Sequence, residues 1–199
     1  MSRLPALALS LAAMATAACA GDQTTAPPAA NVEATHVAHS RQVEPSAELN
    51  RQLASLRAAT ARFHDIDAAR AAGYTILFDP DGAGPGSACL AQSDAAMGEH
   101  YVHPGALFDQ GALDVATPEA LIYEPMKNGK YRLVGVEYVI PFSDVPATAP
   151  APALFGQAFM ANHNPGFQLW ALHVWAWKDN PDGIFSAWNP NVTCQYSSH

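Results

Sequence analysis

The dipeptide Asn128-Gly129 constrains the fold more than any other feature of this sequence. It lies between two apolar segments, residues 120–124 and 131–140. An Asn-Gly pair in this setting is the strongest short-range signal for a β-hairpin, because the tight turn needs positive φ angles. Composition predicts three further strands, at residues 74–78, 99–103 and 168–178. A mainly antiparallel sheet is therefore expected.

One long helix is predicted before the sheet, over residues 46–72. Ser46 is a suitable N-cap, and Glu48 suits the first turn of a helix. The apolar residues recur at three- and four-residue spacing and are Leu49, Leu53, Leu56, Phe63 and Ile66. A long helix followed by antiparallel strands with irregular Pro- and Gly-rich connections predicts an α+β fold, in which the helix covers one face of the sheet.

The first 18 residues have the pattern of a secretory signal peptide. Arg3 precedes an apolar stretch, residues 4–15, that is shorter than the roughly 20 residues needed to span a bilayer. Two cleavage sites compete. Thr16-Ala17-Ala18-Cys19 resembles a bacterial lipobox, whose cleavage leaves a lipid-modified Cys19. Ordinary cleavage at Ala18-Cys19-Ala20 would instead release a soluble protein.

Residues 19–45 are expected to form a flexible tether, since they have no hydrophobic period and are rich in Pro, Thr, Gln and Ala. Residues 46–199 remain for a single globular domain. The protein is thus expected to be exported. It is then either anchored by lipid in the bacterial cell envelope or released from the cell, and it contacts the membrane only through the anchor at Cys19.

The net charge of −8 argues against a nucleic-acid partner. Residues 71–199 contain twelve Asp and Glu but four Lys and Arg, and no basic run occurs. Nucleic acids and anionic lipids both need clustered Lys and Arg. The charge favours a small cationic ligand or a metal ion instead.

The three cysteines are best explained by lipidation of Cys19 and a disulfide between Cys89 and Cys194. Lipidation leaves an even pair, and an oxidising compartment outside the cytoplasm would oxidise it. A cysteine-based metal site is the alternative. The disulfide would close a loop of about 105 residues and stabilise the fold by roughly 4–5 kcal/mol.

The strongest candidate for a functional site is a set of side chains on predicted strands: His100, His103, Glu137 and His173. A carboxylate in the apolar segment around Glu137 is costly to bury without a partner. Imidazole and carboxylate groups together bind divalent transition metals such as zinc. His100 and His103 point to opposite faces of an ideal strand, so both reach one ion only if the chain bulges or His103 has left the strand.

Other interpretations of the same residues stay open. They can form a hydrogen-bonded polar cluster without an ion, or they can act in metal-free acid–base catalysis. A cupin-like metal site would need His-x-His, whereas the chain has His100-x-x-His103. Trp175 and Trp177 are candidates for an aromatic platform that binds sugars or cations, and core packing of the two rings is the alternative. No Gly-x-Ser-x-Gly nucleophile motif is present.

Several distinctive motifs lie between residues 57 and 194. They are Met97-Gly98-x-His100-Tyr101, Pro118-Glu119-Ala120-Leu121-Ile122-Tyr123-Glu124-Pro125, Leu133-Val134-Gly135-Val136-Glu137-Tyr138-Val139, Leu154-Phe155-Gly156-Gln157, Leu172-His173-Val174-Trp175-x-Trp177, Asn180-Pro181-x-Gly183-x-Phe185 and Trp188-Asn189-Pro190 with Cys194. Their combination resembles an uncharacterised family of bacterial secreted or lipoprotein-type hypothetical proteins. The resemblance implies a single secreted domain and carries over no catalytic residue.

Two functional hypotheses follow from the sequence. The preferred one is a cell-envelope or secreted protein whose single domain binds a ligand or partner, with a His/Glu metal site as a candidate. The other is a metal-dependent extracytoplasmic enzyme that uses His100, Glu137 and His173. The sequence does not decide whether a reaction is catalysed.

Overall fold

The computed structural model describes residues 46–79 and 88–198. These residues belong to one compact unit that spans Val43–His199. The predicted signal peptide (1–18), the tether (19–45) and Cys19 lie outside the described residues, so the structure leaves them as predictions.

The prediction of one long helix is wrong, although the α+β class is right. The segment forms α1 (Ala47–Thr60), the 3-10 turn η1 (Ala61–His64) and α2 (Ile66–Ala71). The break lies at Asp65, whose backbone is extended with φ −89° and ψ 110°. Its side chain accepts a hydrogen bond from the backbone N–H of Asp67 at 3.0 Å. This local bond competes with helical pairing and begins a new helix.

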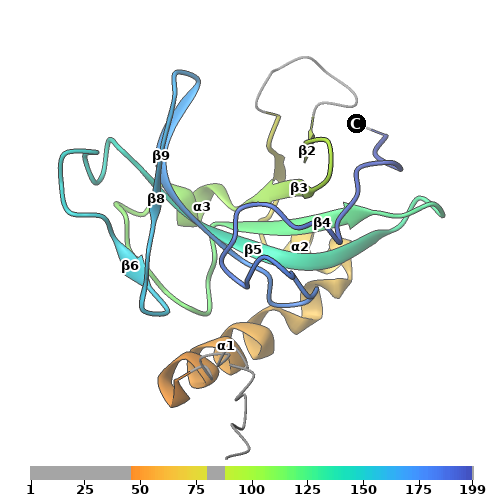
Figure 1. Ribbon diagram of the computed structural model, residues 1–199, viewed down its shortest axis with the longest axis horizontal. Coiled ribbons are helices and arrows are strands. Elements are labelled where there is room, and N and C mark those ends of the chain that lie inside the picture. The colour runs from red at the N-terminus through yellow and green to blue at the C-terminus, as the bar shows by residue number, and fades with distance from the viewer. Residues whose placement is uncertain (1–45, 80–87, 199) are drawn as a thin grey trace, which may run out of the picture. The chain divides into compact units, whose positions relative to one another are not determined.

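The start of α1 and its apolar stripe are as predicted. Ser46 Oγ accepts from the backbone N–H of Leu49 at 3.1 Å. Leu53, Leu56 and Phe63 are buried against the sheet. The helical segment thus covers one face of the sheet, as Figure 1 shows for α1 and α2.

Antiparallel pairing connects seven strands of the described chain in one sheet. The strands are β1 (Ile76–Leu77), β2 (Cys89–Ala91), β3 (Ala96–Val102), β4 (Ala120–Pro125), β5 (Tyr131–Pro141), β8 (Met160–Asn164) and β9 (Phe167–Val174). Their order is β1-β3-β4-β5-β9-β8, with β2 also paired to β3. A separate small hairpin joins β6 (Ala153–Leu154) to β7 (Gln157–Ala158), and a short helix, α3 (Pro104–Leu107), follows β3.

The Asn128-Gly129 hairpin is confirmed. Strands β4 and β5 pair around it, with Glu124 opposite Arg132. Gly129 has a φ of +72°, which a glycine adopts without steric cost. The predicted final strand is shorter than expected, because β9 ends at Val174.

The two faces of the sheet have different partners. On the helix face, the sheet packs on α1, η1 and α2 through the larger core cluster, to which Tyr123, Tyr138 and Leu172 belong. On the opposite face, called the cleft face below, a smaller cluster lies under the C-terminal tail and contains Ala96, Ile122, Val134, Trp175 and Val192. Other side chains of that face, among them Ala120, Val139 and Ala171, line a cleft.

Trp175 and Trp177 do not form the predicted platform. Trp175 is buried in the smaller cluster with 3% of its surface exposed. Trp177 packs against the helix-face core, and its indole N–H donates to Thr60 Oγ1 at 3.2 Å. The two rings lie on different faces because β9 ends at Val174, before both tryptophans. The alternation of side chains along a strand therefore does not apply to them.

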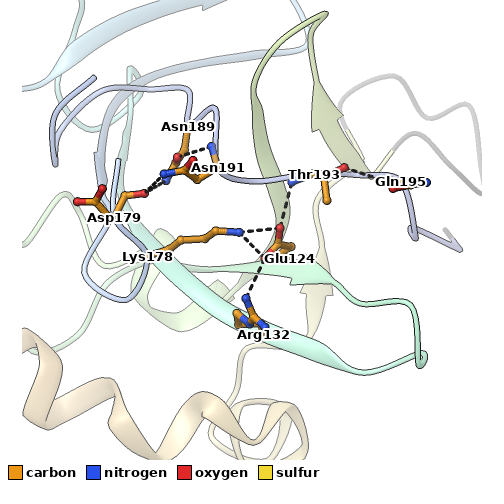
Figure 2. A network of polar contacts seen from close by, with 8 residues as sticks. All are labelled: Glu124, Arg132, Lys178, Asp179, Asn189, Asn191, Thr193 and Gln195. Atoms are coloured by element: carbon orange, nitrogen blue, oxygen red, sulfur yellow. Dashed lines mark hydrogen bonds and ion pairs between the residues drawn. The ribbon is translucent and has the colours of Figure 1, made fainter. Parts of the chain in front are cut away.

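The C-terminal tail is held by covalent and ionic contacts. Cys89 and Cys194 are joined by a disulfide, as predicted. The buried Glu124 carboxylate accepts hydrogen bonds from Lys178 Nζ at 2.7 and 2.8 Å and from the backbone N–H of Thr193 at 3.2 Å. Figure 2 shows Lys178 and Thr193 beside the Glu124 carboxylate, with dashed lines for these hydrogen bonds.

A membrane-spanning segment would need a long apolar helix. None of the helices within residues 46–79 and 88–198 meets that requirement.

Candidate metal centre

A cleft of about 620 Å³ opens on the cleft face of the sheet. Three of the four predicted site residues line it, each from a different strand: His100 from β3, Glu137 from β5 and His173 from β9. The structure therefore brings together residues that are up to 73 positions apart in the chain.

The sheet register explains why these side chains meet. Glu137 lies directly opposite His173 in the β5–β9 pair. His100 lies two strands away from Glu137, because β4 runs between β3 and β5. The β4 residue opposite Glu137 is Ala120, whose small side chain also lines the cleft. The His100 ring can therefore reach across β4 to the carboxylate.

A bulge in β5 sets the direction of Glu137. Ideal alternation would place Leu133 and Glu137 on the same face. In the structure Leu133 belongs to the helix-face core, and Val134 lies opposite no residue of β4. The extra residue shifts the alternation by one position, so that Glu137 faces the cleft while Leu133 faces the helices.

The three polar groups are almost equally spaced. His100 Nε2 lies 3.5 Å from Glu137 Oε2 and 3.5 Å from His173 Nε2. His173 Nε2 lies 3.5 Å from Glu137 Oε1. One carboxylate oxygen thus faces each ring nitrogen, and together the three side chains form a group with metal-ligand spacing.

This spacing is long for hydrogen bonds and suitable for metal ligands. An N–H···O bond is usually about 2.9–3.0 Å long, and a contact of 3.5 Å is at its outer limit. Ligand bonds of about 2.0–2.1 Å to a tetrahedral zinc ion place neighbouring ligand atoms about 3.3–3.4 Å apart. The observed separations of 3.5 Å are close to that value.

Burial keeps both imidazole rings neutral. The pKa of His100 is lowered to about 4, mainly by burial; the charge of Glu137 opposes this shift and His173 adds to it. Burial alone lowers the pKa of His173 to about 4. Burial also raises the pKa of Glu137, against the influence of His100. Neutral imidazole has the free lone pair that a metal ion requires.

His100 and His173 contact polar groups through their Nε2 atoms. Both Nδ1 atoms are buried. Within the described residues His173 Nδ1 has no hydrogen-bond partner, whereas a backbone contact with Gly98 raises the pKa of His100 against the effect of burial. The side chains of His100 and His173 retain 3% and 4% of their surface, whereas Glu137 retains 15%. The site is therefore closed behind the rings and open to the cleft beside the carboxylate.

Among residues 46–79 and 88–198, Glu137 has no ion pair with a lysine or arginine. Its ion-pair contacts within the described residues are with the two histidines, which are neutral at pH 7. The buried Glu124, by contrast, is paired with Lys178 and Arg132. A divalent cation between the rings would give Glu137 the compensation that a buried carboxylate needs.

His103 does not belong to this group, which corrects its prediction as a ligand. It follows the last residue of β3, and its Nδ1 accepts a hydrogen bond from the backbone N–H of Ala106 at 3.1 Å. It therefore caps α3. Its ring packs edge-on against Tyr74, at a centroid distance of 5.2 Å.

The sequence patterns did not predict the strand that forms one wall of the cleft. Strand β8 contributes Met160, Asn162 and His163 to the lining. A usable signal was present, because Asn164 pairs with Phe167 across the two-residue loop Pro165-Gly166, and Pro-Gly is a turn dipeptide.

Comparison of this chain with family models, with curated proteins and with solved structures finds no match. The resemblance to a bacterial secreted family therefore stays a prediction.

Proposed function

We propose that this protein is an exported cell-envelope protein whose single domain binds one divalent transition metal, zinc, through His100, Glu137 and His173. The observation that carries the proposal is the mutual spacing of 3.5 Å between the Nε2 atoms and the Glu137 oxygens. Two neutral imidazoles and one carboxylate suit zinc, and three protein ligands leave a coordination position for another molecule.

Export and anchoring rest on the sequence and agree with the disulfide. The Cys89–Cys194 bond is of a kind that persists in oxidising compartments. In the proposal Cys19 bears the lipid, and residues 19–45 tether the domain to the membrane. Mass spectrometry of the mature protein tests this: an acylated Cys19 as the first residue is expected, and an unmodified N-terminus beyond Cys19 would remove the anchor.

The metal proposal is tested by elemental analysis of protein purified without a histidine tag. One zinc per chain is expected, together with a melting temperature that falls in chelator. His100→Gln and His173→Gln should each weaken zinc binding at least about 100-fold, because loss of a group that only hydrogen-bonds to a metal ligand already costs about 10- to 100-fold.

His163→Gln is the matched control, since this histidine lines the same cleft but lies outside the metal-ligand group. It should bind zinc as the wild type does. Equal binding by all three variants, or no stoichiometric zinc together with a melting temperature that chelator leaves unchanged, would contradict the proposal.

The open position also supports a second function, a zinc-dependent hydrolase. A water molecule bound there would have a pKa lowered to about 7 and could attack an ester or amide. Hydrolysis of p-nitrophenyl esters that requires zinc and is lost in His173→Gln would favour the enzyme. Equal rates with and without zinc would leave binding as the function.

A further inference from the structure

The cleft beside the metal group has an apolar lining. Its walls include Phe78, Leu107, Met160, Phe167, Leu169 and Trp188. These side chains come from segments far apart in the chain, and they line the same cleft as the candidate metal centre. A pocket of this volume and character is suited to a small organic molecule with an apolar body.

The charges around the cleft limit which polar group such a molecule can have. No Lys or Arg of the described chain lines the cleft. Its polar lining consists of the metal group and of Asn162, His163 and Asn164 on β8. A divalent ion bound by one carboxylate and two neutral imidazoles has a net charge of +1. One monoanionic group on the ligand would neutralise it.

The side of the proposed metal site that would hold a fourth ligand lies next to the apolar walls of the cleft. Glu137 keeps 15% of its side-chain surface on the side of the cleft, whereas the two rings are closed off behind. Val139 and Ala171, the next residues on the same face of β5 and β9, also line the cleft. A ligand whose anionic group binds the metal would therefore lay its body along apolar side chains.

We infer that the cleft binds a small monocarboxylate with an apolar tail, whose carboxylate coordinates the metal and whose tail packs against the apolar side chains that line the cleft, including Met160 of β8. This inference rests on the proposed metal site. Burial of each methylene group favours binding, so affinity should increase with tail length.

The test uses the full protein loaded with Co²⁺ in place of zinc. The visible absorption of Co²⁺ on protein ligands reports the metal site before any ligand is added. Titration with octanoate should change that spectrum and give an affinity at least about tenfold higher than acetate, which has the same head group and lacks the tail. Octylammonium, with a similar tail and the opposite charge, should leave the spectrum unchanged.

A matched pair of variants tests the tail contact. Met160 and Ile76 are similarly exposed, at 48% and 46%, and both lie in edge strands of the sheet, but only Met160 lines the cleft. Met160→Ser should weaken octanoate binding about three- to tenfold, whereas Ile76→Ser should leave it unchanged.

The outcomes separate the two proposals. Absence of a Co²⁺ spectrum would contradict the metal site itself. A normal Co²⁺ spectrum with equal affinities for acetate and octanoate, or an equal effect of the two serine variants, would overturn the ligand inference alone. Calorimetry measures octanoate binding to the metal-free protein. An affinity equal to that of the metal-loaded protein would also overturn the ligand inference, because the metal would then not hold the carboxylate.

Discussion

At the scale of single residues, burial shifts the pKa values of several titratable side chains and so changes their charge near neutral pH. His100 and His173 are neutral because burial disfavours the imidazolium form. Glu119 is another case, since its carboxyl group is buried and its Oε2 accepts a hydrogen bond from the backbone N–H of Val139 at 2.9 Å. Each of these groups makes stability depend on pH in a direction that can be derived.

Acidification should destabilise the metal-free protein through His173. Its pKa is about 4 in the folded protein, below the ordinary value of 6.5, so its contribution is fully present above pH 6.5 and is lost as the pH falls through 4. In chelator, the stability of the wild type relative to His173→Gln should fall by about 3 kcal/mol over this window. Urea unfolding at several pH values measures it. A pH-independent difference would contradict the neutral buried ring.

Glu119 should have the opposite dependence. Burial raises its pKa to about 8, although the hydrogen bond from Val139 opposes the shift; Asp109 and Glu137 contribute further to it. The folded protein then binds more protons than the unfolded chain, so stability is highest below about pH 4.5 and is lost as the pH rises to 8.

The isosteric Glu119→Gln variant keeps the carbonyl acceptor and removes the titration. Relative to it, the wild type should lose about 4 kcal/mol of unfolding free energy between pH 4.5 and 8. A wild type that gains stability over that range, relative to the variant, would show that Glu119 is ionised in the fold.

At the scale of elements, two glycines support the sheet in different ways. Gly129, in the β4–β5 turn, has φ +72° and no atom within 4 Å of the place of a Cβ. Gly98, within β3, has φ +93°, and a Cβ there would lie 2.6 Å from the backbone oxygen of Tyr123 on β4. Gly98 thus combines the unusual backbone with close approach of two strands.

Gly129→Ala should cost about 1–2 kcal/mol of stability, the cost of a left-handed backbone alone. Gly98→Ala should cost at least about 3 kcal/mol, because a steric clash with the backbone is added. Chemical denaturation of the two variants gives the comparison. Equal costs would contradict the close approach of β3 and β4.

The contact between the tail and the sheet depends on Lys178. It forms a buried ion pair with Glu124, whose carboxylate is also near Arg132 and the N–H of Thr193 (Figure 2). Lys178→Met should destabilise the fold by about 2–3 kcal/mol, somewhat less than complete loss of a buried partner, because these other donors remain. The exposed Lys130→Met is the control and should change stability by less than about 0.5 kcal/mol.

At the scale of the whole molecule, the disulfide links distant parts of the chain. Cys89 and Cys194 are separated by 105 positions, and the bond ties the tail to β2. Cys89→Ala/Cys194→Ala should therefore lose up to about 4–5 kcal/mol through the larger entropy of the unfolded chain. Urea unfolding of oxidised wild type and variant measures the loss. Identical midpoints would show that the ionic contacts of the tail suffice.

The helical segment shows which structural features the local sequence pattern predicts and which it does not. Residue spacing predicted its apolar side correctly, because a buried stripe on a helix is a local pattern. Its continuity was predicted incorrectly, because the Asp65 side chain forms an Asx turn whose competition with the helix depends on backbone geometry. Fold class and the strands β1, β3, β4, β5 and β9 thus followed from the sequence, while the short strands β2, β6 and β7, strand β8 and the ends of the elements did not.

The candidate metal centre was likewise predicted only in part from the sequence. By itself, the sequence determined that His100, Glu137 and His173 lie on strands, that the sheet is antiparallel and that Cys89 and Cys194 pair. Only the tertiary structure decided that the three side chains face one cleft and that His103 caps a helix instead. The physical reason is that alternation along one strand is local, whereas the facing of β3, β5 and β9 depends on pairing between strands and on the bulge at Val134.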